Sequence, residues 1–167
     1  MARTVDQLSD RELQNFIGAY EREGKTQGGI FTLSELHVER LRRSPSARPP
    51  RDVVGFILDR VSASDHGSVT YLELWDFLMP GVPWKGNHSI RVVGSSLAAV
   101  VAYCIGNGLP LISPLVVQSG SGALARRAIE NIYNEARLYG LDVGPVPEDF
   151  VNEEARKARA LRPEQLP

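Results

Sequence analysis

One short phrase occurs twice in the first half of the chain and restricts what the surrounding segments can form. Residues 28–41 are GGIFTLSELHVERL, and residues 67–78 are GSVTYLELWDFL. The shared positions are a glycine, an apolar residue, a threonine and a Glu-Leu pair: Gly29, Phe31, Thr32, Glu35 and Leu36 in one copy, and Gly67, Val69, Thr70, Glu73 and Leu74 in the other. Each copy predicts a brief extended piece leading into a helix, in a repeated unit of roughly 40 residues that continues through a proline-containing loop to a further helix.

Apolar periodicity and helix-start residues predict helices along most of the chain. The expected helices cover residues 10–20, 34–43, 53–61, 71–78, 90–105, 123–140 and 147–161. Their expected starts include Ser9 with Glu12 as a capping box, Ser34, and Asp52 as a cap. Residues 108–122, GLPLISPLVVQSGSG, instead predict a strand that ends in a glycine-serine turn.

The composition predicts a soluble globular protein and excludes several kinds of site. The 167 residues are 43% hydrophobic and 23% charged, and a net charge of -1 provides no overall attraction to nucleic acid or membranes. The single cysteine excludes an internal disulfide and a zinc site built on paired thiolates. The start MARTVDQLSDREL has no signal-peptide run, and SLAAVVAYCI is too short to span a bilayer. We therefore expect a cytoplasmic protein without a membrane segment.

The two copies of the phrase resemble the loops of a paired EF-hand. Twelve-residue loops counted from Gly24 and from Ser62 have a glycine sixth, an apolar residue eighth and a glutamate twelfth. A calcium ion also needs oxygen ligands at the first, third and fifth places. Those places hold Gly24, Thr26 and Gly28 in one loop and Ser62, Ser64 and His66 in the other. The resemblance therefore implies a metal-free helix pair, and we expect neither a metal nor another cofactor.

A second resemblance covers residues 67–125. The segments SVTYLELWDFL, RVVGSSL and GLPLISPLVVQSGSGAL resemble the winged-helix DNA-binding domain of O6-alkylguanine DNA alkyltransferases and alkyltransferase-like proteins. That family has a V-T-Y-x-E helix, an R-x-V-G-x-A-L recognition helix and an L-P-x-x-x-P-C-H-R-V-V strand before its wing. The resemblance implies that Tyr71 contacts a phosphate and that Arg91 enters the duplex. Leu115 follows Pro114 where the family has its reactive cysteine, so alkyl transfer is excluded and a non-enzymatic role is expected.

The distribution of charge favours a nucleic-acid surface in the same region. No acidic residue occurs between Asp76 and Glu130, an interval that contains the basic residues Lys85, Arg91, Arg126 and Arg127. Such a stretch suits a surface that faces phosphates. The alternative explanation is that a buried helix and strand carry few charges. The candidate nucleic-acid-binding residues are Tyr71, Lys85, Asn87, Arg91, Ser95, Ser96, Ser119 and Ser121.

A second basic cluster lies at a helix end and in the loop after it. It consists of Arg40, Arg42, Arg43, Arg48 and Arg51. Arginines in the last turn of a helix interact favourably with the helix dipole, so a solvated helix end and a phosphate contact are both possible interpretations.

Together these patterns predict a mainly α fold with a small β-sheet, in which a helical repeat precedes a winged-helix-like middle and two C-terminal helices. The expected regions are residues 1–66, 67–125 and 126–167, packed as one compact unit. The expected function is that of a bacterial-like regulatory protein that binds DNA through a helix-turn-helix, with residues 90–97 at the start of the recognition helix. The alternative is a protein-interaction adaptor built on the metal-free helix pair, with Trp75 and Trp84 as its partner-binding residues.

Overall fold

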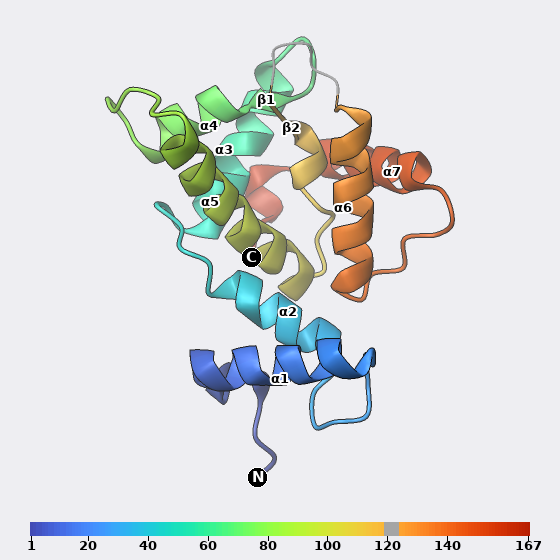
Figure 1. Ribbon diagram of the computed structural model, residues 1–167. Coiled ribbons are helices and arrows are strands. Elements are labelled where there is room, and N and C mark those ends of the chain that lie inside the picture. The colour runs from blue at the N-terminus through green and yellow to red at the C-terminus, as the bar shows by residue number, and fades with distance from the viewer. Residues whose placement is uncertain (119–123) are drawn as a thin grey trace.

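The computed structural model describes residues 1–118 and 124–167, and this part of the chain contains seven α-helices and a two-stranded β-sheet (Figure 1). The helices are α1 (Asp10–Glu23), α2 (Leu33–Arg42), α3 (Pro50–Ala63), α4 (Tyr71–Leu78), α5 (Asn87–Gly106), α6 (Arg126–Leu138) and α7 (Pro147–Ala160). The strands are β1 (Val69–Thr70) and β2 (Val116–Val117), and 3-10 turns span Val5–Gln7, Ser113–Leu115 and Pro163–Gln165. The prediction of a mainly helical fold with a small sheet is confirmed.

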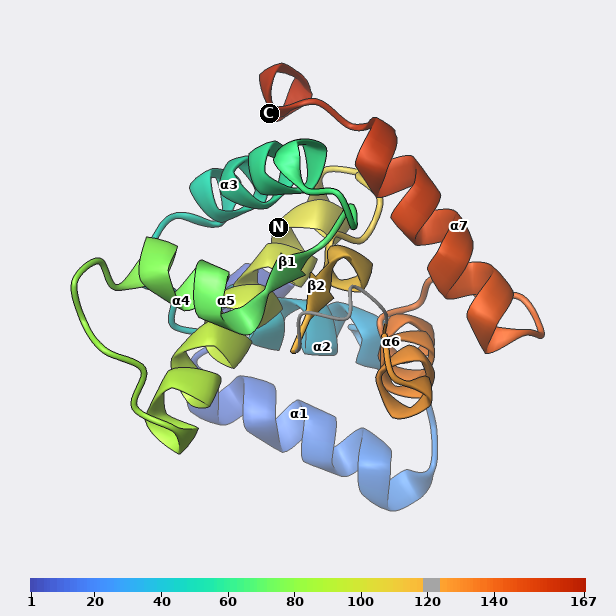
Figure 2. The same ribbon diagram turned by 90° about the horizontal axis from the view of Figure 1, so that it is seen from above.

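The helices form a main body with a smaller N-terminal unit attached to it (Figures 1 and 2). In that unit α1 packs on α2, and α2 in turn packs along α5. The long helix α5 also contacts α3 and α4, whereas α6 packs mainly against α7. In both views the sheet lies between the side formed by α3, α4 and α5 and the side formed by α6 and α7.

The sheet is a short parallel ladder that joins the segment before α4 to the segment after α5. Val69 pairs with Val116, and Thr70 pairs with Val117. The strand expected over residues 108–122 is limited to β2 in the described part, because Pro114 lacks a backbone N–H and lies in a 3-10 turn instead. The extended piece expected around residues 30–32 is not a strand; Thr32 is already the N-cap of α2.

The repeated phrase is a helix start in both copies. Thr32 caps α2 and Thr70 caps α4, and each hydroxyl accepts a 3.2 Å hydrogen bond from the backbone N–H of the glutamate three residues later. In the first copy Glu35 Oε2 also accepts from Thr32 N at 2.7 Å, whereas Glu73 lies 3.5 Å from Arg60. Within each copy, the apolar residue before the threonine and the leucine after the glutamate are buried in one apolar cluster, as in a hydrophobic staple. The first copy belongs to the N-terminal cluster and the second to the main core. Helix capping therefore explains the repetition.

The three caps expected from the sequence, Ser9, Ser34 and Asp52, agree with the structure to different degrees. Ser9 and Glu12 form the expected capping box at the start of α1, with bonds of 3.2 and 2.7 Å. The prediction that Ser34 begins the second helix is wrong by one residue, because Thr32 caps a helix that begins at Leu33. Asp52 is not the cap of α3 but lies in its first turn, since the helix begins at Pro50, where proline is favoured.

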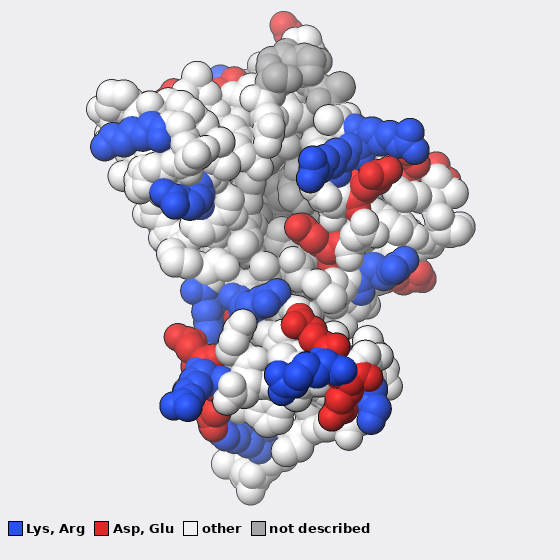
Figure 3. Space-filling view, viewed as in Figure 1, with Lys and Arg blue, Asp and Glu red and all other residues white. Residues whose placement is uncertain are grey.

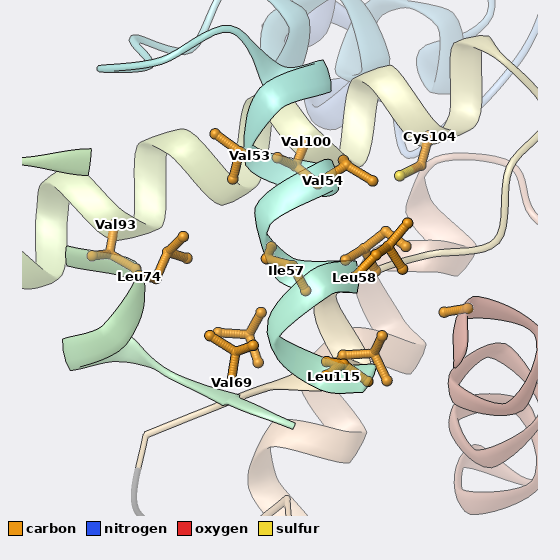
Figure 4. Close-up of a cluster of buried hydrophobic side chains, with 14 of the residues drawn as sticks. Val53, Val54, Ile57, Leu58, Val69, Leu74, Val93, Val100, Cys104 and Leu115 are labelled. Carbon is orange, nitrogen blue, oxygen red and sulfur yellow. The ribbon is translucent and has the colours of Figure 1, made fainter. Parts of the chain in front are cut away.

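The main core lies where α3, α4, α5, the sheet and α7 meet (Figure 4). Leu58, Leu74 and Ala158 represent contributions from the three expected regions, so all three share this core. Cys104 is also fully buried in it, and burial raises the pKa of its thiol to about 12. Because the nucleophile is the thiolate, this cysteine is unreactive near neutral pH.

Two smaller apolar clusters lie outside the main core. One belongs to the N-terminal unit and contains Ile17 and Leu36. The other contains Tyr133 and Ala136 of α6 and Val143 of the following loop. Both clusters contain fewer buried residues than the main core.

By length and composition alone, α5 could cross a membrane. Its 20 residues therefore differ from the expectation that this apolar segment is too short. The helix packs against α2, α3 and α4 and buries Val93, Val100 and Cys104 in the main core. These are the contacts of a core helix, and they are compatible with a soluble protein.

Candidate functional site

Residues 79–86 connect α4 to α5, and two side-chain hydrogen bonds hold this loop against the core. Trp75 Nε1 donates to Val82 O at 2.8 Å, and Ser89 Oγ accepts from Lys85 N at 2.8 Å. Trp75 and Ser89 are both fully buried. The loop therefore holds Lys85 in a defined position just before the first turn of α5.

Three of the predicted nucleic-acid-binding residues lie together at this end of α5. Lys85, Asn87 and Arg91 are exposed. Asn87 and Arg91 are four residues apart and therefore lie on one face of the helix. Among the described residues, neither Lys85 nor Arg91 forms an ion pair. Two cations and an amide are therefore available to an external ligand at this position.

The other predicted residues have different surroundings. Ser95 is partly exposed, and its Oγ donates to Val92 O at 3.2 Å. Ser96 is fully buried, and its hydroxyl has no hydrogen-bond partner in the described part of the chain. The expectation that Ser96 faces a groove is therefore not met, because consecutive helical residues point about 100° apart. Ser119 and Ser121 lie outside the described residues.

The surface around α5 carries basic side chains with few acidic neighbours. Figure 3 shows basic side chains on both sides of a mostly uncharged surface over α5 and α6. On the α6 side, Arg126 lies 3.3 Å from Glu130, so part of its charge is neutralised locally. On the α5 side, the sequence contains no acidic residue from position 77 to position 129. The start of α5 is consequently the more basic part of this surface.

The second basic cluster is largely occupied by contacts within the protein. Both Arg42 and Arg43 donate to the buried carboxylate of Glu39 at 2.7 Å. The Arg40 Nη2 lies 2.9 Å from His37 Nδ1. These contacts fix the end of α2, and they favour the interpretation of a structural helix end over that of a phosphate contact.

The two tryptophans of the alternative prediction occupy unequal positions. Trp75 is fully buried and is unable to contact a partner directly. Trp84 is 38% exposed and packs edge-on against Trp75, with ring centroids 6.1 Å apart. Of the two tryptophans, Trp84 alone is exposed enough to contact a partner of the adaptor.

The EF-hand-like loops contain no cluster suited to a metal ion. In the described residues no group of three His, Cys, Asp or Glu side chains is positioned to hold one. In the second loop the Ser64 hydroxyl accepts a hydrogen bond from His66 N at 3.2 Å. Ser64 stands at the third place of the loop, where a calcium ligand would be needed, and its hydroxyl is engaged in the turn instead. The loops are therefore explained by turn formation and helix capping.

A groove of about 880 Å³ lies between α5 and α6. Leu97, Ala98 and Val101 of α5 form one wall, Ala128 and Ile132 of α6 form the other, and β2 contributes to the floor. Polar groups reach the same space from several elements: Tyr71, Gln118, Arg127, Asn131, Glu135 and Tyr139. The structure thus combines apolar walls with a few polar side chains, as ligand sites do.

The carboxyl of Glu135 and the two tyrosines of the groove have shifted pKa values. Although Glu135 is exposed as a whole residue, the surrounding walls remove water from its carboxyl and raise its pKa. Burial, aided by the charge of Glu135 and opposed by Arg40, raises the pKa of Tyr139 to about 12. Burial also raises the pKa of Tyr71, an effect that a hydrogen bond with Gln118 opposes. Tyr71, predicted as a phosphate contact, is half-buried in this groove.

No protein-family model, curated protein or solved structure matches the chain. Two features of the structure can carry a function: the exposed start of α5 and the groove between α5 and α6.

The groove residues of α6 were not identified from the sequence. A signal was present, since Arg127, Asn131, Glu135 and Tyr139 recur at every fourth position. Such spacing places polar side chains in one stripe along a helix. The stripe alone indicates a solvated face, and only the packing of α5 opposite α6 turns it into the wall of a groove.

Proposed function

We propose that the protein is a non-enzymatic, cytoplasmic DNA-binding protein that contacts duplex DNA with the start of α5. The observation that carries the proposal is the exposed group formed by Lys85, Asn87 and Arg91, which has no acidic neighbour in the sequence from position 77 to position 129. A helix whose N-terminal residues contact base edges is the usual arrangement in helix-turn-helix proteins. The resemblance of residues 67–125 to alkyltransferase-like proteins supports the same assignment.

The three side chains suit different parts of this task. Arg91, on an exposed helical face, can donate two parallel hydrogen bonds to a guanine edge. Asn87, one turn earlier on the same face, can pair with adenine in the same way. Lys85 lies in the loop before the helix, where a cation suits a phosphate. The small overall charge predicts modest affinity that is lost as salt increases.

Fluorescence anisotropy with labelled mixed-sequence duplexes at low salt tests the proposal. Arg91→Ala should weaken binding to the preferred sequences by roughly 1–3 kcal/mol and relax any sequence preference. Lys85→Ala should weaken binding to all duplexes and reduce the salt slope by about one unit. Arg156→Ala is the matched control, because it also removes one positive charge but lies on α7, away from the start of α5 (Figure 2). Its affinity should stay close to that of the wild type.

Two outcomes would refute DNA binding. One is an absence of binding at low salt with protein at tens of micromolar, well above the usual dissociation constants of specific complexes. The other is an equal loss of affinity in Arg91→Ala and Arg156→Ala, which would indicate a general effect of net charge.

We propose a protein-interaction adaptor as the second candidate, because one observation favours it. Trp84 is 38% exposed on the loop before α5, and Ile90 in the first turn is 45% exposed. Exposed tryptophan is common among residues that dominate protein interfaces. A pull-down that compares wild type with Trp84→Ala tests this candidate, which predicts a specific partner that the variant loses.

A further inference from the structure

The groove between α5 and α6 contains a carboxylate and two tyrosines that the proposed DNA contact does not use. Glu135, Tyr71 and Tyr139 all line this groove, together with apolar side chains of both helices. We propose that the groove binds a small organic ammonium ion, whose charge pairs with Glu135 while its apolar body fills the space between α5 and α6. This inference does not depend on DNA binding.

The dimensions of the groove suit one small molecule. Its volume of about 880 Å³ lies within the range of roughly 300–1,000 Å³ found for ligand sites. Its walls include Leu97 and Val101 of α5 and Ile132 of α6. An apolar ligand body would remove these side chains from water and gain free energy in proportion to the area covered.

At the Glu135 end of the groove, the charges favour a cation over an anion. Glu135 forms no ion pair with another described residue. Arg127 lines the same groove but lies eight residues earlier on α6, which is about 12 Å along the helix axis. The other nearby arginine, Arg40, is held beside His37. An ammonium group at Glu135 would therefore complete a pair that the described protein lacks.

The tyrosines add a second source of attraction. An aromatic face attracts a cation within about 6 Å of its centre, and the attraction is strongest where water is excluded. Tyr71 is half-buried and Tyr139 is partly buried at the groove. Burial raises the pKa of Glu135 because loss of water disfavours its charged form, and no charged partner among the described residues offsets this cost. A bound ammonium ion would supply such a partner.

Isothermal titration calorimetry with two matched probes tests the proposal. The first probe is 4-phenylbutylamine, which is a cation at neutral pH, and the second is 4-phenylbutanol, its neutral analogue. We expect the amine to bind the wild type with a dissociation constant below about 1 mM and at least about ten-fold more tightly than the alcohol, which is the effect of one favourable charge contact.

The variants assign the charge contact to one residue. Glu135→Gln should bind the amine and the alcohol equally, because it keeps the shape of the side chain and removes its charge. Glu130→Gln is the control, since it makes the same change of charge on α6 at a residue that pairs with Arg126 and does not line the groove. This control should keep the preference for the amine.

Nuclear magnetic resonance of the wild type provides a readout that does not depend on any variant folding. The ring signals of Tyr71 and Tyr139 should shift as the amine is added, whereas those of Tyr20 in the N-terminal unit should not. The proposal is overturned if the amine fails to bind at millimolar concentration, if both probes bind equally to the wild type, or if Glu130→Gln loses as much affinity as Glu135→Gln.

Discussion

Arg43 Nε donates to Glu39 Oε1 at 2.7 Å, and Glu39 is only 4% exposed. The same carboxylate accepts two bonds of 2.7 Å from Arg42. Arg43 also contacts Asp10 at the start of α1 at 2.8 Å and donates to Leu8 O at 2.8 Å. These contacts tie α2 to the segment that begins α1. A buried carboxylate is tolerated because it is paired, so the N-terminal unit depends on this network as well as on its small apolar cluster.

Replacing Glu39 by Gln should destabilise the protein by about 1–3 kcal/mol, because the change removes a charged acceptor from two arginines. Glu153→Gln is the matched control. Glu153 receives the same paired contact from Arg156, at 2.7 and 2.8 Å and three residues later, but on the exposed face of α7. That change should cost little, since exposed ion pairs contribute little to stability. Urea unfolding measures the free energy of unfolding of both variants. Equal losses would contradict the conclusion that the buried pair of Glu39 stabilises the protein more than the exposed pair of Glu153.

The same carboxylate predicts a dependence of stability on pH. Hydrogen bonds from Arg42 and then Arg43 lower the pKa of Glu39 in the folded protein, although burial opposes them. A group whose pKa is lowered on folding stabilises the protein above its unfolded pKa, about 4.3, and this contribution is lost as the pH falls through the folded value. The difference in melting temperature between wild type and Glu39→Gln should therefore be largest near neutral pH and narrow below about pH 4. A difference that stays constant down to pH 3 would contradict this.

The loop before α5 should depend on Trp75 much more than on Trp84. Trp75→Phe removes the bond to Val82 O and leaves unfilled space in the core, so we expect a loss of about 1–3 kcal/mol in the free energy of unfolding. Trp84→Phe keeps the aromatic edge contact at a partly exposed site and should cost much less. Thermal unfolding of both variants checks the order, and a larger loss for Trp84→Phe would show that the loop is held differently.

Two buried serines of α5 should respond in opposite ways to the same substitution. Ser96→Ala removes a hydroxyl that has no partner among the described residues and should be neutral or stabilising by up to about 1 kcal/mol. Ser89→Ala leaves the backbone N–H of Lys85 without its acceptor and should cost about 1–2 kcal/mol. Chemical denaturation measures both. Loss of DNA affinity in a stable Ser96→Ala protein would contradict its buried position.

Millimolar calcium should leave the melting temperature unchanged. Only a ligand that prefers the native state raises it, and the two EF-hand-like loops have Gly24 and Ser62 where calcium needs its first strong oxygen ligand. The control is the same measurement in a chelator. A rise of several degrees with calcium would show that these loops bind metal and would remove helix capping as a sufficient explanation of the repeated phrase.

Local patterns in the sequence predicted the helices because caps and periodicity act over a few residues. Ser9 with Glu12 starts α1 as expected, and each Thr-x-x-Glu phrase starts a helix. The observed start of a helix differed from the predicted one where two polar residues were both candidates for the N-cap, as Thr32 and Ser34 were. The mainly helical class with little sheet also followed from local signals, since it requires no knowledge of which helices touch.

Tertiary packing decided which residues share a surface. Val69 pairs with Val116 far along the chain, and no local pattern specifies such a partner. Ser96 is buried while its neighbour Ser95 is partly exposed, because α2, α3 and α4 cover particular faces of α5. Tyr71 at the start of α4 and Glu135 of α6 line one groove only because distant segments of the chain pack together. Contacts between distant segments depend on how whole elements pack. A sequence pattern shows only which residues share one face of each helix or strand.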